Sequence, residues 1–135
     1  MPFGPGSLLA FHALYGAGIW IVGVDGSELT EASQGGAAPR WSPTGRQLAF
    51  ESASGIWVIN ADGSGLRQVT FGGRDPVWSP DGSRIAYLDE DSLYVADLDG
   101  THVRTLGTLK LTPSPKPPVA WNPSAAFSAR CTLFN

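Results

Sequence analysis

The chain has 135 residues, of which 42% are hydrophobic and 16% are charged, and its net charge is −3. This composition is typical of a globular protein, and the nine scattered basic residues argue against a nucleic-acid partner. No apolar run approaches the roughly 18 residues that a membrane-spanning helix needs, so we expect no membrane span. A single cysteine, Cys131, excludes an intrachain disulfide.

The amino-terminal segment, residues 1–18, is mildly apolar, and no lysine or arginine precedes Arg40. Because it lacks the charged start of a signal peptide, we expect that this chain as it stands is not exported. If the chain is part of a longer protein, the segment says nothing about its compartment. The localisation therefore stays unknown at this point.

The first predicted strands, residues 9–11 (LAF) and 19–22 (IWIV), are followed by an Asp-Gly turn, and this pattern then repeats. The Asp-Gly pairs and the starts of the apolar runs each recur at intervals of 37 residues; the pairs begin at Asp25, Asp62 and Asp99, and the runs at Ile19, Ile56 and Leu93. Such self-similarity at a fixed spacing is typical of repeat architectures. We therefore interpret the chain as successive copies of one supersecondary unit.

Each complete unit predicts four short strands, named a to d in chain order. In the second unit they are residues 39–41, 47–52, 55–60 and 66–71; in the third they are 76–78, 84–89, 92–97 and 103–108. The a–b turns are SPTG and SPDG, and the c–d turns contain Asp-Gly, a strong hairpin signal. No window has a helical period with caps, so the sequence predicts an all-β protein.

Four antiparallel strands in about 40 residues are typical of a propeller blade, because a single blade cannot bury both of its faces. Aromatic residues recur at two positions of the unit, one occupied by Trp20, Trp57 and Tyr94 and the other by Phe11, Phe50 and Tyr87. We interpret both sets as core between neighbouring blades. The alternative is an exposed aromatic stripe that binds a ligand.

The stretch WSPDGSRIAYLDEDSLYVADLDGTHVRTL resembles the repeat of TolB-type β-propellers, which reads W-S-P-D-G, I-A-F, I-Y-V, D-G and L-T in order. The resemblance is strong over residues 41–106 and partial over 7–36 and 119–123. It implies a ring of six blades that binds a protein or another ligand, often in the bacterial periplasm or outside the cell. The chain is similar also to the propeller domains of prolyl-oligopeptidase-type peptidases.

The predicted domain spans residues 1–123 and holds three blade repeats, residues 2–39, 40–76 and 77–118, followed by a spare strand a at 119–123. Residues 124–135 match no part of a blade and are predicted to be a disordered tail. The first repeat has PFGPGS in place of the expected WSPDGS and so lacks strand a. Three blades form half of a six-bladed ring, so either a second copy closes the ring through the spare strand or the chain is a fragment of a longer propeller.

No catalytic constellation is visible, and we expect neither an enzyme nor a cofactor or metal. The nucleophile-elbow motif G-x-S-x-G is absent, and His12 and His102 occupy different places in their repeats. The acidic turn of Asp89, Glu90 and Asp91 lacks the alternating spacing of a calcium loop, so we interpret it as solvated.

The loops that join strands b to c and d to a vary between repeats, whereas the a–b and c–d turns are nearly constant. Variable loops on a regular scaffold are where binding residues are usually found. The predicted binding residues are His12, Tyr15, Arg74, Asp75, Asp89, Glu90, Asp91 and Lys110. The sequence therefore predicts a non-enzymatic TolB-like module for a protein or peptide partner. The alternatives are the substrate-gating propeller of a peptidase and a strand-exchanged structural assembly without a ligand.

Overall fold

The computed structural model describes residues 7–13, 18–108, 119–121 and 129–131. In these ranges all regular secondary structure is β-strand, which confirms the predicted all-β fold. The strands are β1 (Leu8–His12), β2 (Ile19–Gly23), β3 (Thr30–Ser33), β4 (Ala37–Trp41), β5 (Gln47–Ser52), β6 (Gly55–Asn60), β7 (Arg67–Gln68), β8 (Arg74–Trp78), β9 (Arg84–Asp89), β10 (Ser92–Asp97), β11 (Arg104–Thr108), β12 (Val119–Trp121) and β13 (Ala129–Cys131).

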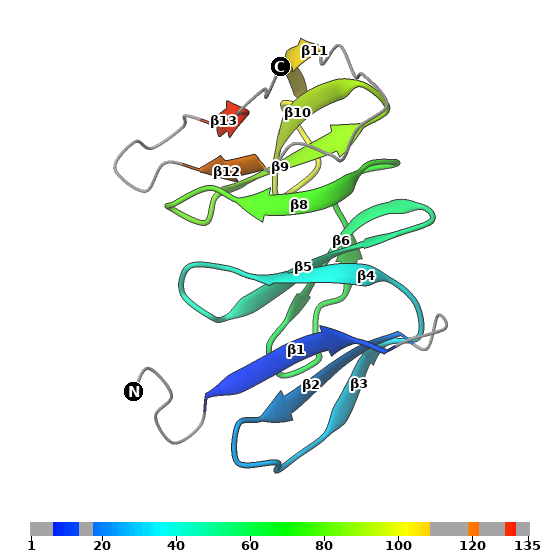
Figure 1. Cartoon of the computed structure of the whole chain (residues 1–135), viewed down its shortest axis with the longest axis vertical. Coiled ribbons are helices and arrows are strands. Elements are labelled where there is room, and N and C mark those ends of the chain that lie inside the picture. The colour runs from blue at the N-terminus through cyan, green and yellow to red at the C-terminus, as the bar shows by residue number, and fades with distance from the viewer. Residues whose placement is uncertain (1–6, 14–17, 109–118, 122–128, 132–135) are drawn as a thin grey trace.

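The strands form four antiparallel sheets in which neighbours in sequence are neighbours in space. The sheets are β1-β2-β3, β4-β5-β6-β7, β8-β9-β10-β11 and β12-β13. We name the first three sheets blades 1, 2 and 3. Figure 1 shows them stacked in chain order, and β1 contacts β4 while β4 and β5 contact β8. Meandering sheets stacked face to face in this way are an arc of a β-propeller.

Strands b and c of blades 2 and 3 have the bounds that the sequence predicts. β5 and β6 pair with Phe50 opposite Trp57, and β9 and β10 pair with Tyr87 opposite Tyr94. Each hairpin needs only two residues between its strands, which fixes its register. Local turn chemistry and alternating apolar residues are therefore sufficient to specify these two hairpins.

The outer strand of blade 2 is shorter than predicted, because β7 keeps only Arg67 and Gln68 in the ladder. The backbone N–H groups of Val69 and Thr70 both donate to the carbonyl of Ile56, at 2.8 and 3.3 Å. The N–H of Ile56 then donates to the hydroxyl Oγ1 of Thr70 at 3.0 Å. A side chain thus replaces the next regular ladder bond, and the strand ends.

Both complete blades begin with a bulged strand a. Ala38 in β4 and Asp75 in β8 have positive φ, 52° and 53°, and the pairing register shifts at these points. Gly36 and Gly73 precede the bulges, and a Cβ on either would lie 2.7 or 2.4 Å from the ring of Phe50 or Tyr87. Glycine is therefore required where the chain enters each blade against an aromatic ring.

The core lies in the two junctions between blades. One cluster joins Ile19 and Ile21 of blade 1 to Leu48, Phe50 and Ile59 of blade 2. The other joins blade 2 to blade 3 and consists of Ala49, Ile56, Val58, Val69, Trp78, Ile85, Tyr87 and Ala96. Blade 2 contributes to both clusters, so its sheet buries apolar side chains on both faces against a neighbouring blade on each side.

The prediction that Phe11 belongs to the core between blades is wrong, since Phe11 is 42% exposed whereas Phe50 is 2% and Tyr87 is 6% exposed. The two buried rings face the preceding blade, and among the described residues no blade precedes blade 1. The second aromatic set, Trp20, Trp57 and Tyr94, is half-buried. Tyr94 stacks on Tyr87 with ring centroids 5.5 Å apart.

The carboxy-terminal segment contains a second short strand. β12, which begins the predicted spare strand, contacts β8 and pairs with β13 inside the segment 124–135 that matched no part of a blade. The register places Trp121 opposite Ala129, much as Trp41 lies opposite Leu48 and Trp78 opposite Ile85. The two strands therefore occupy the a and b positions of a further blade. Within the described ranges, no helix is long and apolar enough to cross a membrane.

Candidate functional site

The connections of the arc emerge at two opposite ends because the strands of each sheet alternate in direction. We call the end with the a–b and c–d connections the turn face, and the end with the b–c and d–a connections the loop face. The predicted binding residues that the structure describes belong to the loop face. The two faces use their polar side chains differently, and this difference helps to locate a candidate site.

On the turn face, aspartates bind their own backbone. Asp25, Asp62 and Asp99 each accept a hydrogen bond at 2.9 Å from the backbone N–H two residues later, and a second from that residue's hydroxyl. The hydroxyl bonds, and then the backbone bonds, lower the pKa of all three carboxyls. These aspartates therefore stabilise the turns, as expected for Asx turns.

Asp81 in the a–b turn of blade 3 has a larger shift. Its carboxylate accepts bonds from the hydroxyls of Ser79 and Ser83 and from the backbone N–H of Ser83, at 2.7, 2.8 and 3.0 Å. These bonds lower the pKa of Asp81 to about 2, and the Ser79 hydroxyl contributes most. Its role is also structural, because the carboxylate closes the turn.

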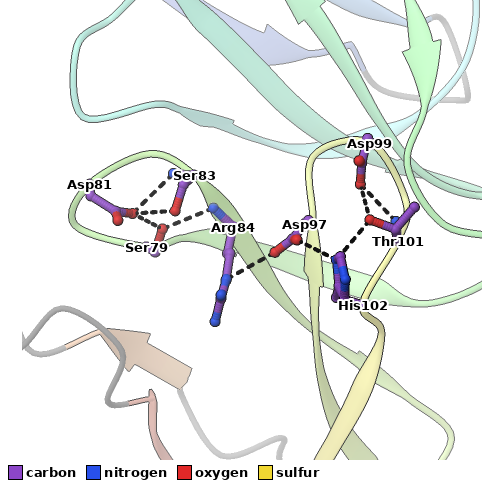
Figure 2. A network of polar contacts seen from close by, with 8 residues as sticks. All are labelled: Ser79, Asp81, Ser83, Arg84, Asp97, Asp99, Thr101 and His102. Carbon is purple, nitrogen blue, oxygen red and sulfur yellow. Dashed lines mark hydrogen bonds and ion pairs between the residues drawn. The ribbon is translucent and has the colours of Figure 1, made fainter.

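A charged cluster lies beside these turns in blade 3 (Figure 2). Arg84 Nε contacts Asp97 Oδ1 at 2.9 Å, and His102 Nδ1 contacts Asp97 Oδ2 at 2.9 Å. The hydroxyl of Thr101 lies 3.0 Å from the same Nδ1 atom. A hydroxyl activated by a histidine–aspartate pair would meet the other ring nitrogen, so this geometry is not a charge relay. His102 is 80% exposed, and the cluster ties strands β9 and β10 to the turn between β10 and β11.

Three of the predicted loop-face residues lie close together at the junction of blades 2 and 3. Arg74 Nε lies 3.6 Å from the carboxylate of Asp75, and the register places Arg74 opposite Leu88, next to Asp89. The backbone N–H of Asp75 donates to the carboxylate of Glu51 at 2.6 Å, so blade 2 reaches across to the bulge of blade 3. Arg74 and Asp75 therefore have structural contacts in addition to their predicted role.

The remaining predicted residues lie apart or outside the described part of the chain. Glu90 and Asp91 are exposed in the turn between β9 and β10, and Glu90 has a positive φ of 48°. His12 ends β1 in the first blade, and blade 2 separates it from the other predicted residues. Tyr15 and Lys110 lie outside the described residues. In the described part of the chain, no group of three or more His, Cys, Asp or Glu residues is placed to hold a metal ion.

A groove of about 450 Å³ lies at the same junction, and its lining residues come from both blades. Val69 and Phe71 belong to blade 2 and the loop that follows it, Tyr87 and Asp89 to β9, and Val103 to the turn before β11. Phe71 is 95% exposed, although it is a large apolar residue. Burial, and to a smaller extent the Asp89 carboxylate, raises the pKa of Tyr87. Of these residues the sequence predicted only Asp89 as part of a site.

A second groove, of about 410 Å³, lies between blades 1 and 2. The two grooves share equivalent positions of the 37-residue repeat. Ala32, Asp62 and Gly63 line the second groove, and the residues 37 positions later, Val69, Asp99 and Gly100, line the first. No aromatic residue lines the second groove. The sequence carries a signal for Phe71, because the equivalent position of the preceding repeat, 37 residues earlier, holds the polar residue Gln34.

Comparison with known proteins supports the fold. No protein-family model and no curated protein sequence matches the chain. Among solved structures, one described as TolB from Agrobacterium tumefaciens is 25% identical over 81% of this chain and 47% of that chain, with a TM-score of 0.62. A chain of the nidogen/laminin complex is 21% identical over 70% of this chain and 41% of its own length, with a TM-score of 0.56.

An enzyme also has the same architecture in part. The acylaminoacyl peptidase of Pyrococcus horikoshii is 22% identical over 68% of this chain and 20% of that chain, with a TM-score of 0.53. The chain thus spans less than half the length of each of these three proteins. Since these structures contain β-propellers, the chain is a segment of a β-propeller, similar in structure to TolB and to the propeller domains of proteins with other activities.

Proposed function

We propose that the chain is a non-enzymatic, TolB-like propeller module that binds a protein or peptide through its loop face. The observation that carries this proposal is the contrast between the two faces. On the turn face, Asp25, Asp62, Asp81 and Asp99 are engaged by their own backbone. On the loop face, the side chains of Asp89, Glu90 and Asp91 make no hydrogen bond or ion pair within the described residues. Phe71 is exposed. The loop face therefore has side chains available for a partner.

The similarity to the structure described as TolB and to a chain of the nidogen/laminin complex supports a binding module. Propeller scaffolds commonly place recognition residues in loops on a rigid arc, because the sheets hold the loops in fixed positions. The short hairpins of blades 2 and 3 hold Asp89 and its neighbours in this way.

The test is selection from a random peptide library displayed on phage, with the immobilised full chain as bait. We expect peptides to be enriched and their binding to be lost when Asp89, Glu90 and Asp91 are changed together to their amides. A matched variant with Glu28→Gln and Glu31→Gln removes carboxylates from blade 1, and it should retain binding. Equal loss in both variants, or no enrichment, would contradict loop-face recognition.

The second candidate is the substrate-gating propeller of a prolyl-oligopeptidase-type peptidase, favoured by the similarity to the Pyrococcus peptidase. The two candidates differ in what flanks the propeller. A catalytic domain encoded downstream in the parent gene would support the peptidase, whereas a signal sequence upstream without such a domain would support the binding module. Determining the flanking coding sequence separates them.

We also propose that two copies of the chain close a six-bladed ring. Leu9 and Phe11 of β1 are 48% and 42% exposed, whereas Leu48 and Phe50 at the same positions of β5 are buried at 0% and 2%. β1 pairs only with β2 in the described part of the chain, while β5 and β9 each have two neighbours. A strand a donated by a second copy, namely its β12, would complete blade 1.

In this dimer, β12 of each copy pairs with β1 of the other copy. This pairing replaces the one between β12 and β13 within a single chain. We expect a dimer when size exclusion is coupled to light scattering. Truncation after Thr112 removes β12 and should abolish the dimer, whereas deletion of residues 124–135 removes the competing β13 and should favour it. A monodisperse monomer of the full chain, or a dimer that survives loss of β12, would exclude ring closure. A purely structural assembly would give the dimer but no peptide binding.

A further inference from the structure

The groove between blades 2 and 3 combines an exposed aromatic ring with two carboxylates. Phe71, Asp89 and Asp99 all line it, and Phe71 is 95% exposed. A phenylalanine side chain that stays in water contributes no burial energy, so the fold does not require it at this position. Its ring is therefore available to a ligand in the groove.

The repeat indicates that Phe71 and Asp89 are additions to a common scaffold. The positions 37 residues earlier hold Gln34 and Ser52, which are neutral and polar. Neither of these two residues lines the equivalent groove between blades 1 and 2. Since the backbone accommodates both pairs of residues, the aromatic ring and the carboxylate give the second junction its particular chemistry.

The charge of the groove is negative. Its described lining includes Asp89 and Asp99 but no lysine, arginine or histidine. Asp99 uses one carboxylate oxygen in its turn, whereas the side chain of Asp89 makes no hydrogen bond or ion pair within the described residues. A Cβ on Gly72 would lie 3.1 Å from Asp89 Oδ2, so this carboxylate lies against the loop that carries Phe71. The Asp89 carboxylate and the Phe71 ring would both attract a cation.

We propose that this groove binds an arginine side chain of the protein or peptide partner, an inference that rests on the proposed function. A guanidinium group is planar, stacks on an aromatic ring and pairs with a carboxylate through two parallel hydrogen bonds. Phe71 provides the ring, Asp89 provides the carboxylate, and Val69 and Val103 provide apolar wall for the methylene stem. A groove of about 450 Å³ has the volume for such a side chain and part of its backbone.

The test is an NMR titration of the ¹⁵N-labelled full chain with the blocked tripeptide acetyl-Gly-Arg-Gly-amide. We expect saturable shifts at the amides of Phe71, Gly72 and Asp89. The same tripeptide with citrulline, which keeps the shape but lacks the charge, should bind at least tenfold more weakly. The lysine tripeptide should also bind more weakly, because an ammonium group cannot pair in a bidentate way.

Two variants install the residues that the repeat already accepts, so both should fold. Phe71→Gln, which removes the stacking ring, and Asp89→Ser, which removes the carboxylate, should each weaken binding of the arginine peptide by about tenfold, or about 1.4 kcal/mol. Glu31→Gln removes a charge of the same sign from blade 1, outside the groove, and should change the affinity less than twofold.

The inference is overturned if arginine and citrulline peptides bind equally, if Glu31→Gln weakens binding as much as Asp89→Ser, or if no saturable shift occurs. Its failure can be separated from failure of the proposed function. Peptides enriched on the loop face without dependence on arginine or Phe71 would refute the groove and leave the binding module in place. If the phage selection enriches no peptide and the titration produces no shift, both are refuted.

Discussion

Blades 2 and 3 share one backbone design but differ in the chemistry at equivalent positions. In blade 2, Gln47 Nε2 donates to Asn60 Oδ1 at 3.4 Å, whereas in blade 3 the same positions hold Arg84 and Asp97 in an ion pair at 2.9 Å. The a–b turn has Thr44 in blade 2 and Asp81 in blade 3. The fold therefore accommodates either a neutral or a charged pair of side chains at these equivalent positions, provided that the side chains form their hydrogen bonds.

The two blades also differ in how they join their neighbours. Trp78 of blade 3 donates from its indole Nε1 to the carbonyl of Arg40 in blade 2 at 2.9 Å, and Glu51 of blade 2 accepts from the backbone of Asp75 in blade 3. Trp57 instead donates within its own blade, to Ser54 at 3.0 Å. Apolar packing supports both junctions, and polar links also cross the second one, where the Glu51–Asp75 bond holds the bulge at the loop-face end of β8.

The largest loss of stability is expected from a substitution in the apolar core that joins blade 2 to blade 1. Phe50→Ala removes a ring that is 2% exposed and should lower the free energy of unfolding by about 3–5 kcal/mol. Phe71→Ala is the matched control, because that ring is 95% exposed, and it should change stability by less than about 0.5 kcal/mol. Urea denaturation measures both, and similar values for the two variants would contradict the assignment of the core.

A smaller effect is expected from the polar link between blades 2 and 3. Trp78→Phe keeps most of the buried ring but leaves the carbonyl of Arg40 without its indole donor, which should cost about 1–2 kcal/mol. Trp57→Phe removes a bond to an exposed serine and should cost less than about 0.5 kcal/mol. Thermal unfolding of the two variants compares them directly. A larger loss for Trp57→Phe would show that the link between blades is unimportant.

Replacing the Arg84–Asp97 pair of blade 3 by the Gln–Asn pair of blade 2 should change stability still less. The double variant Arg84→Gln, Asp97→Asn should change stability by less than about 1 kcal/mol, since partly exposed ion pairs contribute little. It should also reduce the dependence of the melting temperature on salt between 0.05 and about 0.5 M. The reverse exchange in blade 2, Gln47→Arg with Asn60→Asp, is the control and should increase that dependence. If the melting temperature of both double variants depends on salt as that of the unchanged chain does, the ion pair is contradicted.

The smallest effect concerns pH and the a–b turns. The pKa of Asp81 is lowered from 3.8 to about 2 in the folded chain, so its contribution is fully present above the unfolded value near 3.8 and is lost as the pH falls through about 2. Stability should therefore decrease over this window, and the decrease should be shallower in Asp81→Asn. Thr44→Asp should add a similar acid-dependent step in blade 2. Melting temperatures between pH 2 and 5 with no difference between these chains would contradict the role of the carboxylate.

The sequence by itself determined the elements whose causes are local. The 37-residue spacing, the Asp-Gly turns and the alternating apolar residues are sufficient for the hairpins β5–β6 and β9–β10, whose bounds were predicted. The structural role of Asp62, Asp81 and Asp99 was also predictable, because an Asx turn involves only residues two apart. Of the residues that line the groove between blades 2 and 3, only Asp89 was predicted from the sequence as part of a site.

Only the tertiary structure decided what depends on contacts between blades. Phe11 and Phe50 occupy equivalent places in the repeat, yet one is exposed and the other buried, because burial depends on whether a preceding blade covers the ring. β13 pairs with β12 inside a segment that matched no part of a blade in the sequence. The groove of Phe71, Asp89 and Val103 joins residues from two blades, and no local pattern can specify a surface that forms only when sheets pack together.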